Sequence, residues 1–227
     1  MPLDVSELPL VGGNPALDLV NTVERGIPRP GRPAHDFLSD TAALLRWTVR
    51  AGLLTDVEAD RAAQAWRDDP AAAHASRDAV RDMREQLHVA LLAAIPPANG
   101  GSAGDPAGDD PIAAGAALVR LHERWSGASA RAKLVLDRGD RPRVRLAYGT
   151  DPATLVPDRI ADAALDVLLT ADLTRVRVCP IPEGGCGWLF LDQSRNGSRR
   201  WCRMADCGNT TKARRLKQRR RAAGAAV

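Results

Sequence analysis

The stretch that decides the fold of the C-terminal part runs from Cys179 to Cys207 and reads CPIPEGGCGWLFLDQSRNGSRRWCRMADC. It holds all four cysteines of the chain, in two pairs. Six residues separate Cys179 from Cys186, four separate Cys202 from Cys207, and fifteen lie between the pairs. Four thiolates delivered by two local turns suit the tetrahedral coordination of Zn²⁺, with Zn–S distances of about 2.3 Å. The spacing therefore predicts one structural zinc ion held by four cysteines.

Three other uses of the cysteines stay open: two disulfides, an iron–sulfur cluster, and free or redox-active thiols. The N-terminus carries Asp4 and Glu7 and no basic cluster, which is not typical of a secretory signal. We therefore expect a cytoplasmic protein, and a reducing compartment favours metal over disulfides. A catalytic zinc is disfavoured because four cysteines leave no open position. The Cys-x-x-Cys motif of oxidoreductases is absent.

The rest of this segment predicts a small module over residues 173–227. Between the cysteine pairs, Trp188–Asp192 alternates like a strand, and Gly208 to Thr211 resembles a helix start. The expected order is a first cysteine pair, a β-hairpin, and a second pair at the N-terminus of a basic helix, which is a treble-clef-like arrangement. So small a module buries little surface, so aromatic side chains and the metal are expected to supply its stability.

The charge of the chain is unevenly distributed. The net charge is +4, but residues 195–221 contain eleven Lys/Arg and one acid, a net of +10, so the remainder carries −6. A basic helix of this kind is stabilised beside phosphate, where each neutralised charge releases counterions. We predict nucleic-acid binding, most simply DNA, through Arg195, Arg199, Arg200, Arg203, Lys212, Arg214, Arg215, Lys217, Arg219, Arg220 and Arg221. A solvated tail or an acidic protein surface are the alternatives, and a membrane is not expected because the helix lacks a large apolar face.

The preceding part, residues 1–172, has the pattern of a mostly helical α+β domain. Thr55 and Glu58 form a capping-box motif that predicts the start of a helix. A β-hairpin is expected from two alternating segments, and residues 96–111 are expected to form a flexible loop because they are rich in Gly and Pro. The expected helices cover residues 39–51, 76–95, 112–125 and 158–172, and the expected strands 132–137 and 143–148.

Two polar residues, Asp18 and Asn21, lie on a short apolar helix near the N-terminus. Buried polar groups need partners, so they either form structural hydrogen bonds or line a small-molecule pocket. The preceding Gly12-Gly13-Asn14 lacks the lysine of a phosphate-binding loop and is interpreted as a turn. No nucleophile–base pairing stands out in the chain, so we predict no catalytic residues and no enzyme activity.

Two stretches resemble known families. CGWLFLDQSRNGSRRWCRMADCGNTTKARRLKQRRR, residues 186–221, resembles the CGNR-type zinc finger of bacterial regulators, and LVGGNPALDLVNTV, residues 10–23, resembles the start of the ABATE domain. The resemblance implies a stress-linked transcription regulator with a zinc-dependent DNA-binding module, and it implies the same four cysteine ligands. The sequence departs from the family where Cys-Gly-Asn-Arg becomes Cys207-Gly208-Asn209-Thr210, and its first cysteine pair is wider.

Two hypotheses follow for the whole protein. In the first, the zinc module binds DNA and the N-terminal domain senses a small-molecule effector or forms a homodimer. In the second, the N-terminal domain is a small-molecule-binding domain, and the zinc module contacts protein or RNA.

Overall fold

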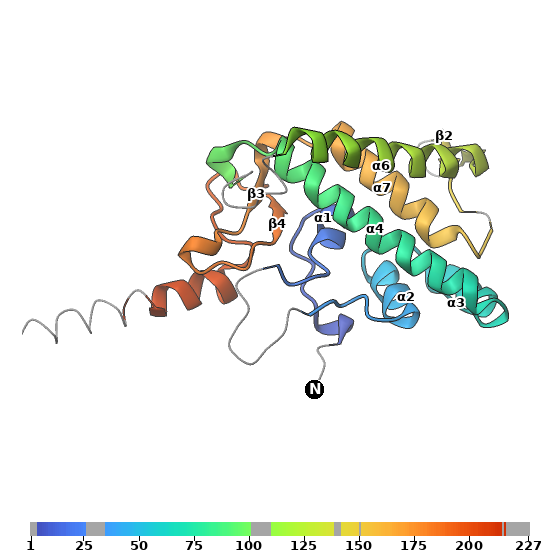
Figure 1. Cartoon of the computed structure of the whole chain (residues 1–227), viewed down its shortest axis with the longest axis horizontal. Helices are drawn as coiled ribbons and strands as arrows, with labels where there is room; N and C mark the ends of the chain where they lie inside the picture. Colours follow the sequence, from blue (N-terminus) through green and yellow to red (C-terminus); the bar gives the residue numbers. More distant parts are fainter. Residues whose placement is uncertain are drawn as a thin grey trace, which may run out of the picture.

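The fold consists of a helical body and a small cysteine-bearing module at one end (Figure 1). A computed structural model describes residues 4–25, 35–100, 110–138, 142–149, 151–214 and 216. The helices are α1 (Pro15–Val20), α2 (Thr41–Arg50), α3 (Asp56–Asp68), α4 (Pro70–Ala94), α6 (Pro111–Arg131) and α7 (Leu155–Thr170). The strands are β1 (Lys133–Asp137), β2 (Arg143–Ala147), β3 (Val176–Val178) and β4 (Leu189–Leu191).

The long helices α4, α6 and α7 pack along one another and form the frame of the body (Figure 1). The short helix α1 lies against α4, α7 and the strand β4, so it stands where the body meets the module. None of the described helices combines the length and the apolar character needed to span a lipid bilayer.

Side-chain caps explain where most of these helices begin. The capping box predicted at Thr55 and Glu58 is confirmed, because the Thr55 hydroxyl accepts from the Glu58 amide while the Glu58 carboxylate accepts from the Thr55 amide. Asp69 caps α4, and Pro70 occupies its first position, so this helix begins six residues before the predicted start. Likewise, Asp110 caps α6 and Pro111 occupies its first position.

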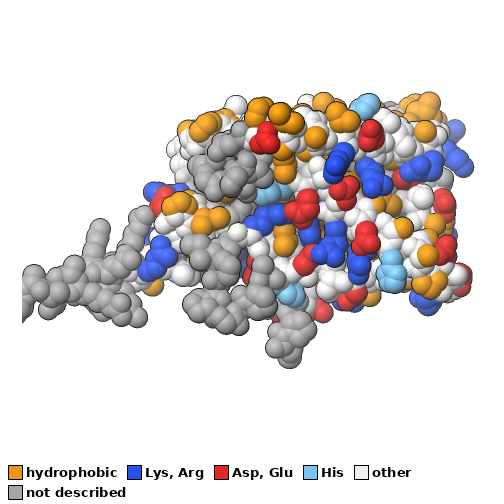
Figure 2. All heavy atoms as spheres, viewed as in Figure 1, with side chains coloured by type: hydrophobic (Ala, Val, Ile, Leu, Met, Phe, Trp, Pro, Cys, Tyr) orange, Lys and Arg blue, Asp and Glu red, His pale blue; other side chains and the backbone are white. Residues whose placement is uncertain are grey.

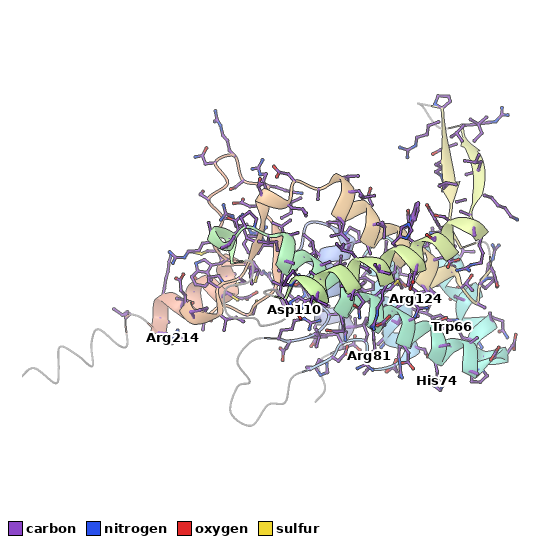
Figure 3. The ribbon with its side chains drawn as sticks, turned by 45° about the horizontal axis from the view of Figure 1, so that its top comes forward. Trp66, His74, Arg81, Asp110, Arg124 and Arg214 are labelled. Carbon is purple, nitrogen blue, oxygen red and sulfur yellow. The ribbon has the colours of Figure 1, made fainter. Side chains whose placement is uncertain are left out.

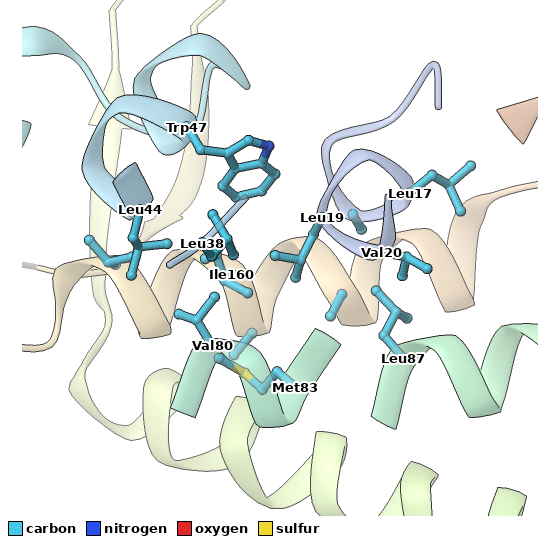
Figure 4. Packing of buried hydrophobic residues seen from close by; sticks show 14 of the residues in the cluster. Leu17, Leu19, Val20, Leu38, Leu44, Trp47, Val80, Met83, Leu87 and Ile160 are labelled. Carbon is cyan, nitrogen blue, oxygen red and sulfur yellow. The ribbon is translucent and has the colours of Figure 1, made fainter. Parts of the chain in front are cut away.

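One hydrophobic core runs through the body and continues into the module. Figure 4 shows Leu19 of α1 and Trp47 of α2 facing Val80 and Met83 of α4, with Ile160 of α7 between them. All five side chains are essentially inaccessible to solvent. Val176 of β3 and Leu189 of β4 belong to the same buried cluster, so the module shares apolar packing with the body.

Two antiparallel sheets of two strands each complete the described structure. The predicted hairpin is confirmed as β1 and β2, with Lys133 opposite Ala147 and Asp137 opposite Arg143. The second sheet pairs β3 with β4, Val176 standing opposite Leu191. The mostly helical α+β class predicted for the body is therefore confirmed. Of the predicted loop 96–111, residues 97–99 form a 3₁₀ turn, and 101–109 lie outside the described residues.

Candidate metal centre and nucleic-acid interface

The first cysteine pair lies at the closed end of the β3–β4 hairpin. The Cys179 amide donates to the Trp188 carbonyl at 2.9 Å, and the Gly187 amide donates back to the Cys179 carbonyl at 3.0 Å. The loop between Cys179 and Cys186 packs closely around the Cys179 sulfur. A Cβ on Gly185 would lie only 2.8 Å from the Cys179 Sγ. The glycine explains how a loop of six residues still brings two ligands to one point.

The second pair comes from a turn at the opposite side of the cluster. Cys202 is buried, and Cys207 lies in a π-helical turn, Met204–Gly208, that runs directly into an α-helix over residues 209–214. The last ligand is thus attached to the start of the basic helix, as the sequence predicts. A π-helical turn inside a helix is frequent at functional sites.

The four sulfurs have the spacing of a zinc tetrahedron. All four Sγ atoms lie within 4.8 Å of one another. Cys186 Sγ is 3.4 Å from Cys202 Sγ, which is 3.8 Å from Cys207 Sγ. Zn–S bonds of about 2.3 Å in a tetrahedron place neighbouring sulfurs about 3.8 Å apart. None of the four forms a disulfide. The cluster is therefore the site of one structural zinc ion.

The electrostatics of the cluster also call for a cation. Hydrogen bonding to the Cys179 sulfur raises the pKa of both Cys186 and Cys202, because a thiol that donates to a neighbouring thiolate keeps its proton. Four thiolates at this separation are stable together only when a metal ion neutralises them. Bound Zn²⁺ supplies that charge and fixes both cysteine turns, without an open coordination position for substrate.

The strand order of the module differs from the predicted one. The prediction placed a hairpin between the two cysteine pairs, but only β4 lies there among the described residues. Its partner β3 comes before Cys179, so the hairpin encloses the first pair. The reason is that β3 is only three residues long, so its Val-Arg-Val alternation is too short to indicate a strand by itself.

Residues 192–201 are held mainly by polar contacts in place of a second strand. The buried Asp192 carboxylate accepts from the Ser194 amide at 2.9 Å, from the Arg199 amide at 2.9 Å and from the Arg177 side chain at 3.2 Å. Burial opposes the charge of this carboxylate, but the Ser194 and Arg199 hydrogen bonds and the Arg177 charge hold the pKa of Asp192 below its usual range. Asp192 thereby fixes the loop that leads to Cys202, a role that sequence analysis missed.

Arg199 faces the metal loop and the body instead of solvent. Its guanidinium lies over the Phe190 ring, 4.5 Å from the centroid. It also donates to the carbonyls of Trp201 at 3.1 Å, of Cys202, and of Val11 at 3.4 Å. Arg199 is one of the predicted nucleic-acid contacts, and that role stays a prediction. In the structure its donors brace the loop carrying the zinc ligand Cys202.

The other five predicted basic contacts that fall within the described residues are all exposed on the module. Arg195, Arg203 and Lys212 are exposed, and Arg203 lies 3.4 Å from Asp206. Arg200 is exposed as well and pairs with Glu183. Arg214 is also exposed and marks this end of the molecule in Figure 3, and Figure 2 shows basic side chains on the module. The predicted contacts Arg215, Lys217, Arg219, Arg220 and Arg221 lie outside the described residues.

The helix and the first cysteine pair are also in contact through Arg214. A Cβ added to Gly184 would lie 3.1 Å from the Arg214 guanidinium carbon, so this side chain rests on the loop of the first pair. The positive φ of 100° at Gly184 favours glycine as well. The described start of the basic helix is therefore packed on the metal site.

Asn21 connects the body to the module. Its Nδ2 donates to the Leu189 carbonyl at 2.8 Å, and its Oδ1 accepts from the Leu189 amide at 2.8 Å. The side chain is 1% exposed. Two residues further along β4, the Leu191 amide donates to the Gly12 carbonyl at 2.8 Å. The N-terminal segment thus continues the hydrogen bonding of the β3–β4 sheet.

Asp18 supports the same junction from the side of the body. Its Oδ1 accepts from the Gly12 amide at 2.8 Å, which holds the Gly12 turn against α1. Burial raises the pKa of Asp18 to about 6. Both Asp18 and Asn21 therefore bond to the backbone of the protein itself. Their role in a ligand pocket stays a prediction.

Comparison with known families agrees with these two parts. The ABATE family model, described as "Putative stress-induced transcription regulator", matches residues 13–171, and the CGNR zinc finger model matches residues 175–220. No curated protein matches the chain. Because the first match covers more than half of the sequence, the chain belongs to the ABATE family, with a CGNR zinc finger behind that domain.

Proposed function

From this family membership we propose that the protein regulates transcription by binding DNA through its zinc module. The observation that carries the proposal is the charge of the module. Five of its described basic side chains are exposed, namely Arg195, Arg200, Arg203, Lys212 and Arg214. The segment from 195 to 221 has a net charge of +10 in a chain whose net charge is +4. A concentration of charge on a metal-fixed scaffold is typical of phosphate recognition.

The zinc ion gives this surface its shape. Cys207 lies in the turn that starts the basic helix, Cys202 precedes that turn, and Arg214 rests on the loop of the first cysteine pair. The metal therefore holds the start of the helix beside Arg200 and Arg203 without contacting DNA itself. These side chains contact phosphates, which position a protein on the duplex but carry no direct sequence information.

The body would then determine how the module is presented. Asn21 and Gly12 bond to β4 at 2.8 Å each, and the buried core continues from α1 into β3 and β4. A module attached in this way moves with the body, so a change in the body is transmitted to the DNA-binding surface. Detection of a signal by the ABATE domain would act through this junction.

A salt titration of DNA binding tests the proposal. Zinc-loaded protein is titrated against a fluorescent duplex, and its affinity is measured by anisotropy. If the protein makes roughly six to ten phosphate contacts, raising the salt concentration from 50 to 200 mM should lower its affinity by about 10³–10⁵-fold. The double variant Arg195→Ala/Lys212→Ala should bind more weakly and show a salt slope smaller by about 2. The matched control is Arg61→Ala, since Arg61 is exposed on α3 in the body.

Two results would contradict the proposal. The first is an affinity that does not change with salt, and the second is a double variant that binds as the wild type does. A single-stranded RNA of equal charge is titrated in parallel to distinguish RNA binding from DNA binding. Tighter binding to RNA than to duplex DNA at every salt concentration would identify RNA as the partner in place of DNA.

A further inference from the structure

The β1–β2 hairpin exposes a continuous apolar face. Register places Leu134 opposite Leu146 and Leu136 opposite Val144, so the four side chains lie on one side of the sheet. They are 73%, 40%, 53% and 64% exposed, in that order. In Figure 3 the two strands project above the helices, at the end of the body far from Arg214. An exposed patch of large aliphatic side chains marks an interaction surface.

The hairpin also has an open edge. Within the described residues its sheet contains only β1 and β2, and β1 therefore offers one row of backbone groups to a further strand. A two-stranded hairpin is marginally stable by itself, and proteins usually cover or charge an edge of this kind. An apolar face and an open edge on the same projecting hairpin point to a partner that is itself a strand.

The sequence of β1 identifies that partner. Lys133–Asp137 reads Lys-Leu-Val-Leu-Asp, with opposite charges at its two ends and an apolar centre. When this strand is laid antiparallel on a copy of itself, Lys133 meets Asp137 of the partner subunit at each end. Leu134 meets Leu136 of the partner subunit, and Val135 meets its own copy. Every cross-strand pair is then either of opposite charge or apolar, the combinations that stabilise antiparallel sheets.

We propose that β1 pairs antiparallel with β1 of a second copy of this chain, about a two-fold axis at Val135. The two hairpins form one four-stranded sheet, and the apolar side chains of both copies lie side by side on one face. Such an isologous contact is the commonest interface of homodimers. Asp137 already lies 3.7 Å from Arg143 within the hairpin, so Lys133 of the partner subunit joins an existing charge cluster.

The other edge of the hairpin does not suit the same pairing. If β2 met its own copy in the equivalent register, Arg145 would lie opposite Arg145 at the axis, and Arg143 would face an alanine. Like charges directly opposite each other destabilise a sheet. The self-complementary charges therefore select β1 over β2. The dimer does not require DNA, but it would present two zinc modules related by the same two-fold axis.

The first experiment measures the oligomeric state of the full-length, zinc-loaded protein without DNA. Sedimentation is recorded for the wild type, Lys133→Glu, Asp137→Lys, and the equimolar mixture of these two variants. We expect a wild-type dimer that dissociates in about the micromolar range, as small interfaces do. Each single variant places like charges opposite each other twice, so its dimer should weaken by at least tenfold. The mixture pairs opposite charges at both ends and should restore dimers.

Arg145→Glu is the matched control, because it changes a charge on the outer strand β2 and should leave the dimer as it is. A cross-link then tests the axis itself, independently of the charge variants. Val135→Cys should form a disulfide-linked dimer under mild oxidation of zinc-loaded protein, since directly opposed residues have Cα atoms about 4.5–5.5 Å apart. Arg145→Cys should not. A wild type that stays monomeric, or a dimer that withstands Lys133→Glu without a Val135→Cys cross-link, would overturn the proposal.

Discussion

Replacing Asn21 tests whether the body and the module are joined as the structure indicates. The Asn21 side chain makes two hydrogen bonds of 2.8 Å with the backbone of Leu189, and it is 1% exposed. Asn21→Ala removes both partners and leaves a buried N–H and a buried C=O unsatisfied. Each such group costs about 1–3 kcal/mol. We therefore expect the free energy of unfolding to fall by about 2–4 kcal/mol. This is less than the highest sum of the two group costs, because the site relaxes around the cavity.

The assay is urea denaturation of zinc-loaded protein. With an m-value of about 3 kcal/mol/M, the predicted loss lowers the midpoint by about 1 M. Asn99→Ala is the matched control, since Asn99 also uses both ends of its amide to reach the module, at Thr174 and Arg177. Asn99 is only half-buried, so water can replace its bonds, and its loss should cost about 1 kcal/mol. Equal shifts for the two variants would refute the assignment of Asn21 as the buried connection.

Three further predictions concern the metal site and the junction. Arg199→Lys keeps the charge but loses the planar guanidinium that reaches three carbonyls, so a chelator should remove zinc about 10–100-fold faster. The control Arg195→Lys changes an exposed arginine and should lose zinc at the wild-type rate. Equal rates for the two variants would contradict the bracing role of Arg199. Because the pKa of Asp18 is raised to about 6 from 3.8, the native state binds the extra proton between these values, and stability should fall by up to about 3 kcal/mol as pH rises through that window. Asp18→Asn should remove this slope from the urea midpoints, and an unchanged slope would assign it to another group. Chelation of zinc should lower the urea midpoint of the wild type, Zn²⁺ should restore it and Mg²⁺ should not, since a cluster of thiolates does not suit Mg²⁺; recovery with Mg²⁺ would contradict a thiolate site.

Features that depend on neighbouring residues could be predicted from the sequence. The capping box at Thr55 and the hairpin 133–147 each depend on a few consecutive side chains, and both were predicted at nearly their observed positions. The cysteine cluster could be predicted for the same reason, because two short loops place its ligands. The start of α4 was placed too late, because residues 71–73 are alanines without apolar periodicity and the local start signal of Asp69 and Pro70 was not used. Asp69 and Pro70 begin that helix.

Contacts between distant parts of the chain could not be predicted from the sequence. Asn21 and Leu189 are 168 positions apart, and nothing in either local sequence indicates that they meet. The strand β3 shows its role only through its pairing with β4, because three residues are too few for a periodic pattern. The sequence identified Asn21 as a polar residue in need of a partner, but the partner was supplied by a backbone far along the chain.

The arginines of the module show why charge alone does not define a binding surface. Arg199 and Arg200 are adjacent and carry the same charge, so sequence analysis assigned both to nucleic acid. In the structure Arg199 directs its donors at three carbonyls and lies over Phe190, whereas Arg200 is exposed beside Glu183. A guanidinium that bonds to the protein has fewer donors left for phosphate, and its loss weakens the scaffold as well as the charge. Weaker DNA binding by an Arg199 variant would therefore not demonstrate a phosphate contact, whereas the exposed Arg195 and Lys212 separate the two effects.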